Sequence, residues 1–193
     1  MTLWLKARRA HTVLPFSLLL FTVFAVLVRD VVVVLPSIAG SHQVVLSLFV
    51  PIPLVAGMAL CLESRVAAAE ASAVRTVARL DAGLVLATMA AAVSISLLIR
   101  QVTQAPQVDI TGRNTVFLTG LMLCGRIISR QRAVLIPTVW PIVVVLVGFR
   151  PTGDAYPWTI IPEPAGAPHA TIAAALFMCT GILAQLYTSR KIS

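Results

Sequence analysis

The sequence predicts an all-α, polytopic membrane protein with about six transmembrane helices. Three observations support this fold class. The mean hydropathy is +0.95, only 11% of the 193 residues are charged, and several apolar runs approach membrane-spanning length. A soluble domain would carry roughly 25% charged residues, and a membrane span needs about 20 mostly apolar residues. We therefore expect one transmembrane domain, residues 1–193, without a separate soluble domain.

The first eleven residues, MTLWLKARRAH, combine one tryptophan with three basic residues. This pattern suits an interfacial helix with an aromatic anchor, and a disordered basic tail is an equal alternative. No small-residue cleavage site follows, so we interpret the next apolar run as a retained span. The spans are expected at 12–28, with a continuation to 35 as an option, then at 43–62, 82–99, 114–128, 133–149 and 169–187.

Two of these runs contain closely spaced prolines, Pro51 and Pro53 in the second and Pro137 and Pro141 in the fifth. Each proline removes a backbone donor, so we expect kinks or local unwinding at these positions. A turn is expected at 36–41 and a loop at 100–113. Residues 150–168 form a longer, proline-rich outer loop, and its re-entry into the membrane is left open.

The stretch 63–81, ESRVAAAEASAVRTVARLD, is the longest polar interruption between two apolar runs. Its apolar side chains recur at steps of three or four residues, which is the helical period. The stripe is rich in alanine and valine, whereas a dedicated membrane-surface helix carries larger apolar residues. We therefore predict a cytoplasmic amphipathic helix between spans two and three that docks a partner protein. A helix lying on anionic lipid is the alternative.

Four charged residues of this stretch are the predicted partner-binding residues. Arg75 and Arg79 are four positions apart and repel each other in isolation, so something acidic should face them. Arg65 lies on the same polar side, and Glu70 lies toward the helix start, where the dipole favours anions.

The distribution of basic residues predicts that both termini are cytoplasmic. With that orientation 11 of the 15 Lys and Arg residues lie inside and 4 outside, as the positive-inside rule requires. The net charge of +8 is therefore interpreted as topogenic and lipid-facing, and nucleic acid is not an expected partner. The four outer residues are Arg29, Arg100, Arg113 and Arg150.

The motifs of an enzyme or a metal site are missing from the sequence. It contains no HxxxH, CxxC or GxSxG pattern and no paired carboxylates. We therefore predict no catalytic residue, no metal and no cofactor. The spans contain no Asp or Glu away from their ends, which argues against a proton-coupled carrier. Cys61, Cys124 and Cys179 are interpreted as small packing residues.

The layout resembles the six-span permease subunits of ABC-type exporters. Three pieces carry the resemblance: MTLWLKARRAH, LESRVAAAEASAVRTVARLD and RPTGDAYPWTIIPEPAGAP. The resemblance implies an N-terminal interfacial helix, a coupling helix that docks on an ATPase, and an outer segment before the last span. It implies a bacterial-type plasma membrane, a dimer with itself or a sister subunit, and export of a hydrophobic or amphipathic compound. The chain has no GxxxxGK[ST] loop, so any ATPase must be another chain.

Two other functions are kept as alternatives. The first is the substrate-binding membrane subunit of an energy-coupling-factor importer, although its pocket would need more convergent polar groups. The second is a membrane assembly or immunity protein without a transport role.

Overall fold

The computed structural model describes residues 8–38, 40–64, 74–103, 107–129 and 133–191. Its helices and strands are α2 (Ala10–Leu27), β1 (Val32–Ser37), β2 (Gly40–Val45), η1 (Leu46–Phe49), α3 (Ile52–Glu63), α5 (Val74–Thr103), α6 (Gln107–Ile128), α7 (Leu135–Val147), η2 (Pro157–Thr159) and α8 (Pro168–Lys191).

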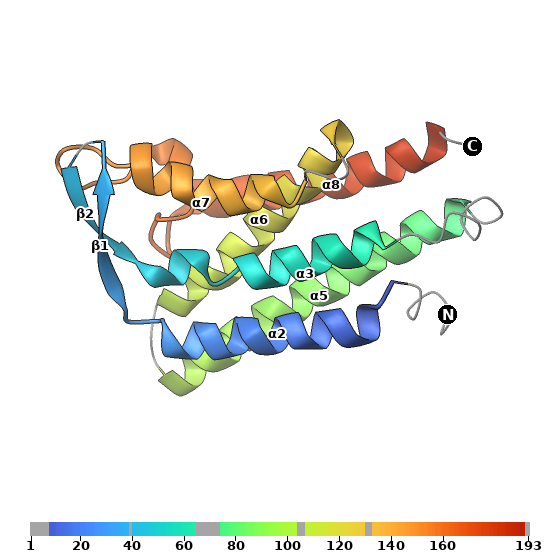
Figure 1. Cartoon of the computed structure of the whole chain (residues 1–193), viewed down its shortest axis with the longest axis horizontal. Helices are drawn as coiled ribbons and strands as arrows, with labels where there is room; N and C mark the ends of the chain where they lie inside the picture. Colours follow the sequence, from blue (N-terminus) through green and yellow to red (C-terminus); the bar gives the residue numbers. More distant parts are fainter. Residues whose placement is uncertain (1–7, 39, 65–73, 104–106, 130–132, 192–193) are drawn as a thin grey trace.

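The α-helices run alternately back and forth along the long axis of the molecule (Figure 1). α2 begins and α8 ends at the same end of this bundle, which we call the terminal end. The β-hairpin of β1 and β2 lies across the opposite end, which we call the hairpin end. α2 packs against α3, and α5 and α7 pack against α6, so these pairs are antiparallel neighbours. α8 packs mainly against α6, which is not adjacent to it in the sequence.

Four helical stretches are long and apolar enough to cross a membrane, and they are Ala10–Leu27, Leu46–Glu63, Val77–Thr103 and Pro168–Tyr187. Large apolar side chains such as Phe16, Leu98 and Leu183 point outward from these helices, each more than 60% exposed. Outward apolar faces on long helices indicate a membrane-embedded protein. The 13-residue α7 reaches only about 20 Å, so six complete crossings stay a prediction.

The hairpin is a feature that the sequence interpretation missed. We expected 12–28 to continue as helix to residue 35, but α2 ends at Leu27 and Val32–Ser37 form a strand. Four consecutive valines favour extended structure because their branched side chains fit a pleated strand. β1 pairs with β2 in antiparallel register from Val32–Val45 to Ser37–Gly40. The hairpin contacts α7 through Ser37, whose hydroxyl donates a hydrogen bond to the carbonyl of Leu146 at 2.8 Å.

The loop predicted at 100–113 is shorter than expected. α5 continues to Thr103 and α6 already begins at Gln107, so Gly112 lies inside a helix. Its hydrogen allows α6 to approach α5, because a Cβ atom there would lie 3.3 Å from the Cβ of Ser96. Small residues of this kind permit close packing of helices in a membrane.

The predicted proline kinks fall at two different kinds of position. Pro51 and Pro53 lie at the start of α3, after η1, where a missing backbone donor is tolerated. Pro137 lies in the first turns of α7, and Pro141 lies inside that helix.

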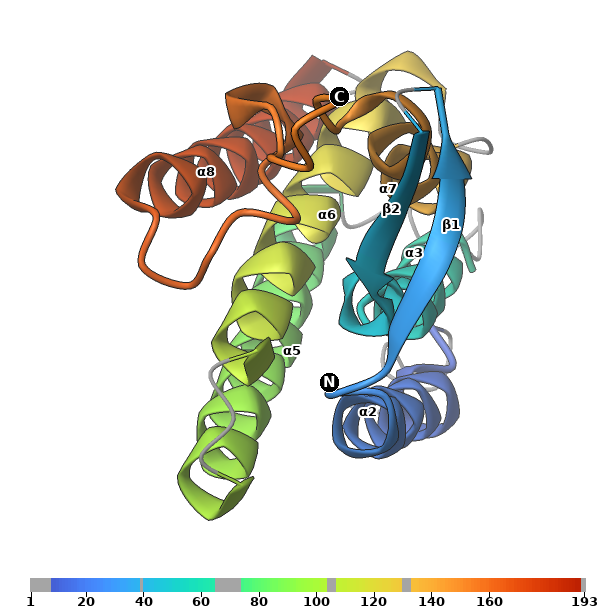
Figure 2. The same cartoon turned by 90° about the vertical axis from the view of Figure 1, so that its left-hand side faces the viewer.

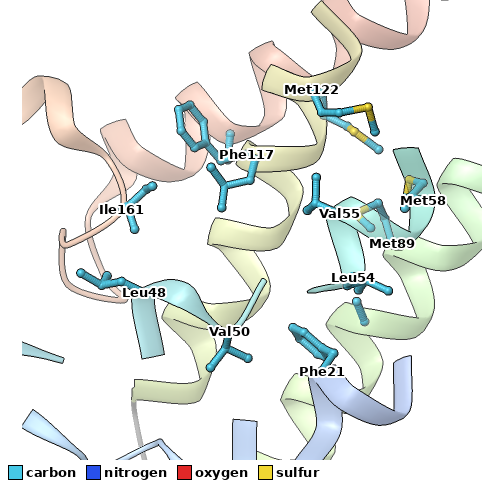
Figure 3. Close-up of a cluster of buried hydrophobic side chains, with 14 of the residues drawn as sticks. Phe21, Leu48, Val50, Leu54, Val55, Met58, Met89, Phe117, Met122 and Ile161 are labelled. Carbon is cyan, nitrogen blue, oxygen red and sulfur yellow. The ribbon is translucent and has the colours of Figure 1, made fainter. Parts of the chain in front are cut away.

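The core lies where α2, α3, α5 and α6 meet η1 and the loop before α8. Figure 3 shows Phe21, Leu54 and Met89 in this common interior, and each is at most 4% exposed. Phe117 of α6 is also fully buried, and its ring packs against Phe177 of α8. Gly120 allows α6 and α8 to approach closely. A Cβ on Gly120 would lie 2.5 Å from the backbone nitrogen of Met178, so the two backbones are in direct contact.

Candidate functional site: the polar ends of the bundle

Two of the four predicted partner-binding residues belong to the described residues, and these two lie at the terminal end. Arg65 and Glu70 lie outside these residues, whereas Arg75 and Arg79 are in the first turns of α5. The side chain of Arg79 is exposed. The stretch 63–81 thus differs from a single separate helix, because Glu63 closes α3 and residues 74–81 continue into α5 without a break.

An ion pair between Arg8 and Asp81 is the most buried charged contact among the described residues. The Nη2 of Arg8 donates to the Oδ2 of Asp81 at 2.7 Å, and both side chains are 3% exposed. Asp81, which directly precedes the expected span 82–99, is therefore a buried carboxylate, and the sequence analysis had not identified it as one. It lies near the start of α5 at the terminal end, and its charge is compensated by a guanidinium, as a buried carboxylate requires.

Arg8 also holds the end of α3. Its Nη1 donates to the carbonyl of Leu62 at 2.9 Å, and the hydroxyl of Ser64 donates to the carbonyl of Arg8 at 3.1 Å. Arg126, from the last turn of α6, donates to the same Leu62 carbonyl at 3.3 Å. Carbonyls at the C-terminal end of a helix lack intrahelical partners and attract cations. This polar cluster therefore ties the segment before α2 to the ends of α3 and α6 and the start of α5.

The sequence interpretation counted Arg8 among the basic residues of the N-terminal segment and placed Asp81 at the end of the cytoplasmic amphipathic helix. One signal could have revealed the pair. Asp81 has the same helical phase as Ala78 and Val85, which are 8% and 0% exposed. A carboxylate on the buried face of a helix requires a cation, and the basic residues before α2 were the available candidates.

A second polar cluster lies at the hairpin end, around Arg113 in α6. The Nη2 of Arg113 donates to the carbonyls of Ile160 at 3.0 Å and Glu163 at 2.6 Å, and its Nη1 donates to that of Pro164 at 2.9 Å. The fully buried Asn114 donates its amide hydrogen to the carbonyl of Ile161 at 2.9 Å. These two side chains thus fasten the loop before α8 onto α6.

The electrostatics of Arg113 differ from those of Arg8. Its acceptors are carbonyl oxygens and the amide oxygen of Asn114, and no carboxylate of the described residues lies within ion-pair distance of it. Arg113 lies ahead of the predicted span 114–128. Burial lowers the pKa of this guanidinium, and the carboxylate of Glu163 opposes that shift. The group still carries a full positive charge, because arginine is not deprotonated in proteins.

A cavity of about 250 Å³ adjoins Arg113, where α5, α6 and the start of α8 meet. Figure 2 looks onto this end of the bundle and shows the hairpin in front of α3 and α7, away from the lower part of α5. The cavity wall therefore comes from helices and the loop before α8. Its lining residues are Val93, Ser96, Leu97, Arg100, Gly112, Arg113, Ala165 and Thr171.

Aromatic rings pack under the loop before α8. Trp158 lies edge-on against Trp140 of α7, with ring centroids 6.1 Å apart, and Trp140 is 6.1 Å from Phe117 of α6. Arg150 lies over the ring of Tyr156 at 5.1 Å, a favourable cation–π distance. Through these contacts the loop before α8 packs against the bundle at the hairpin end.

Metal ligation has no candidate in the described part of the chain, which contains no group of three His, Cys, Asp or Glu side chains arranged to hold an ion. Comparison with known proteins gives no match to any family model, curated protein or solved structure. The chemistry of the two polar ends is thus the basis for assigning a function.

Proposed function

We propose that this chain is the membrane-spanning permease subunit of an ABC-type exporter, driven by a separate ATPase subunit. One observation supports the proposal most. The alternating helices bring the start of α2, the end of α3, the start of α5 and the end of α8 to one end of the bundle. The terminal end would then be the cytoplasmic face, and the segment that includes the start of α5 would dock the ATPase.

The geometry at the start of α5 suits a docking element that transmits movement. Residues two positions apart on a helix point in nearly opposite directions. Arg79 is exposed, whereas Asp81 is buried against Arg8. A partner bound to the Arg79 side would therefore push on a helix whose other side is fastened to the segment before α2 and to the end of α3. Such a rigid connection carries a displacement into the bundle.

Co-purification tests this proposal. We expect a tagged full-length chain, extracted in mild detergent, to recover a protein that contains a GxxxxGK[ST] loop and hydrolyses ATP. The double variant Arg75→Glu, Arg79→Glu should lower that recovery at least about tenfold, because like charges replace the complementary ones. Arg150→Glu is the matched control, since it reverses a charge at the hairpin end. Absence of any ATPase, or equal recovery by the double variant, would refute the proposal.

A further inference from the structure

The cavity at the hairpin end has a cationic part and an apolar part. Val93, Leu97 and Arg100 follow one another along one face of α5 toward the hairpin end, at steps of four and three residues. The wall thus changes from aliphatic to basic along the direction of the predicted membrane normal. Arg113 adds a second guanidinium at the basic part.

The guanidinium of Arg113 has donors left for a ligand. Its Nε is buried without a hydrogen-bond partner among the described residues, and its Nη1 donates to one carbonyl only. A guanidinium has five N–H groups, so at least the Nε–H and one Nη1–H are not used by these contacts. Carbonyl dipoles and the carboxylate of Glu163, which is not within ion-pair distance, compensate its charge only in part.

The cavity hydroxyls contribute less to ligand binding. Ser96 donates its hydrogen to the carbonyl of Ala92 at 2.9 Å, and Thr171 donates to that of Ala167 at 3.3 Å. Both hydroxyl hydrogens are thus used by backbone carbonyls four residues earlier in the chain. Among the described lining residues, the remaining polar attraction comes mainly from the guanidinium groups of Arg100 and Arg113, which favours an anionic ligand.

We propose that this cavity binds the phosphate group of an anionic phospholipid, with the phosphate at Arg100 and Arg113 and the start of an acyl chain against Val93 and Leu97. Guanidinium groups match phosphate oxygens in geometry and charge. Leu97 is 49% exposed, so its wall opens to the apolar surroundings of α5. This inference goes beyond the proposed exporter role and holds whether or not an ATPase partner exists.

Lipid titration of the purified full-length chain in detergent tests the proposal. The probes are short-chain phosphatidylglycerol, short-chain phosphatidylcholine and inorganic phosphate, with heat of binding as the readout. We expect phosphatidylglycerol to bind at least about tenfold tighter than phosphatidylcholine, because only the former carries a net negative charge. Inorganic phosphate should bind more weakly than phosphatidylglycerol. Equal affinity for the two lipids would overturn the anion assignment, and tighter binding of inorganic phosphate would overturn the lipid assignment.

Single substitutions test whether phosphatidylglycerol binds in this cavity. Arg100→Gln should weaken phosphatidylglycerol binding about tenfold, whereas Arg150→Gln, which removes the same charge from the same end, should leave it unchanged. Leu97→Ser should weaken binding more than Leu98→Ser, because Leu98 is adjacent and more exposed but does not line the cavity. A similar loss in Arg100→Gln and Arg150→Gln would place the binding on the general surface charge and refute the cavity site.

Discussion

Arg8 and Arg113 lie at opposite ends of the bundle, and their charges are compensated in different ways. Arg8 has a carboxylate, that of Asp81, at 2.7 Å, with both side chains almost fully buried. Arg113 is half-buried and donates to carbonyl and amide oxygens only, the nearest of which is the carbonyl of Glu163 at 2.6 Å. In the first arrangement a carboxylate neutralises the charge of the guanidinium. In the second, the dipoles of the oxygen acceptors stabilise the guanidinium charge without neutralising it.

This difference separates two roles that a basic residue can have in a membrane-embedded protein. A neutralised pair fixes the relative positions of the chain segments that carry it, and it attracts no further ion. A guanidinium held by neutral dipoles also fixes its segment, but it retains attraction for an anion. We therefore assign a fastening role to the Arg8–Asp81 pair, and fastening combined with the proposed ligand binding to Arg113.

The largest expected effect is the loss of the buried ion pair. Asp81→Ala should lower the free energy of unfolding by about 3–5 kcal/mol, because the charge of Arg8 stays buried without its carboxylate partner. Thermal unfolding in detergent measures the change. The double variant Arg8→Met, Asp81→Leu should recover most of the loss, since apolar replacements of a buried pair are often neutral. A loss below about 1 kcal/mol in Asp81→Ala would contradict the neutralised pair.

Removal of the second arginine should have a smaller effect. Arg113→Met takes the charge and its hydrogen bonds away together, so no unpaired charge remains, and we expect a loss of about 2 kcal/mol. The carbonyls of Ile160, Glu163 and Pro164 lose their donor, so amide exchange in 160–167 should become faster. Arg150→Met is the control on the same loop. If Arg113→Met were as destabilising as Asp81→Ala, the distinction between the two arginines would fail.

Much of the fold could be predicted because hydropathy dictates it. The described chain contains helical structure in each of the six expected spans, although the second of them, 43–62, begins inside β2. Apolar runs in a membrane must satisfy their backbone hydrogen bonds internally, which favours helices. The hairpin was not predicted, because a continuous run of four valines has no periodicity. Such a run fits the end of a helix and a strand equally well. Its strand form depends on a tertiary support, the carbonyl of Leu146 in α7, which sequence patterns do not reveal.

The two polar clusters were beyond sequence reasoning for a different reason. Arg8 and Asp81 are 73 positions apart, and Arg113 meets acceptors about 50 positions later. Their pairing follows from which helices are neighbours, and the carbonyl acceptors around Arg113 leave no mark in the sequence. The predicted docking residues illustrate the limit further: the exposure of Arg79 agrees with the polar side of the pattern, but its binding role stays a prediction.

A carboxylate placed beside the cavity should compensate the charge of its guanidinium groups, as Asp81 compensates that of Arg8 at the terminal end. Thr171→Asp introduces a negative charge beside the cavity guanidinium groups, and we expect phosphatidylglycerol affinity to fall about tenfold. Thr171→Asn has nearly the same shape without the charge, so it should keep most of the affinity. Stability should change little in both variants, because Thr171 is exposed. An equal loss of affinity in the two variants would show that shape, and not charge, governs the cavity.

The smallest effect is expected for a third arginine, Arg29, which pairs with Asp30. The Nε–Oδ2 distance is 2.8 Å, close to that of the Arg8–Asp81 pair, but the two side chains are 33% and 68% exposed. Water and salt screen such a pair, so Asp30→Ala should change the free energy of unfolding by no more than about 0.5 kcal/mol. A comparison of Asp30→Ala with Asp81→Ala under the same conditions separates the effect of burial on the free energy of unfolding from the effect of the N–O distance. If both substitutions had similar effects, contact distance would govern the stability of these pairs, and the contrast between a neutralised and a solvated arginine would lose its basis.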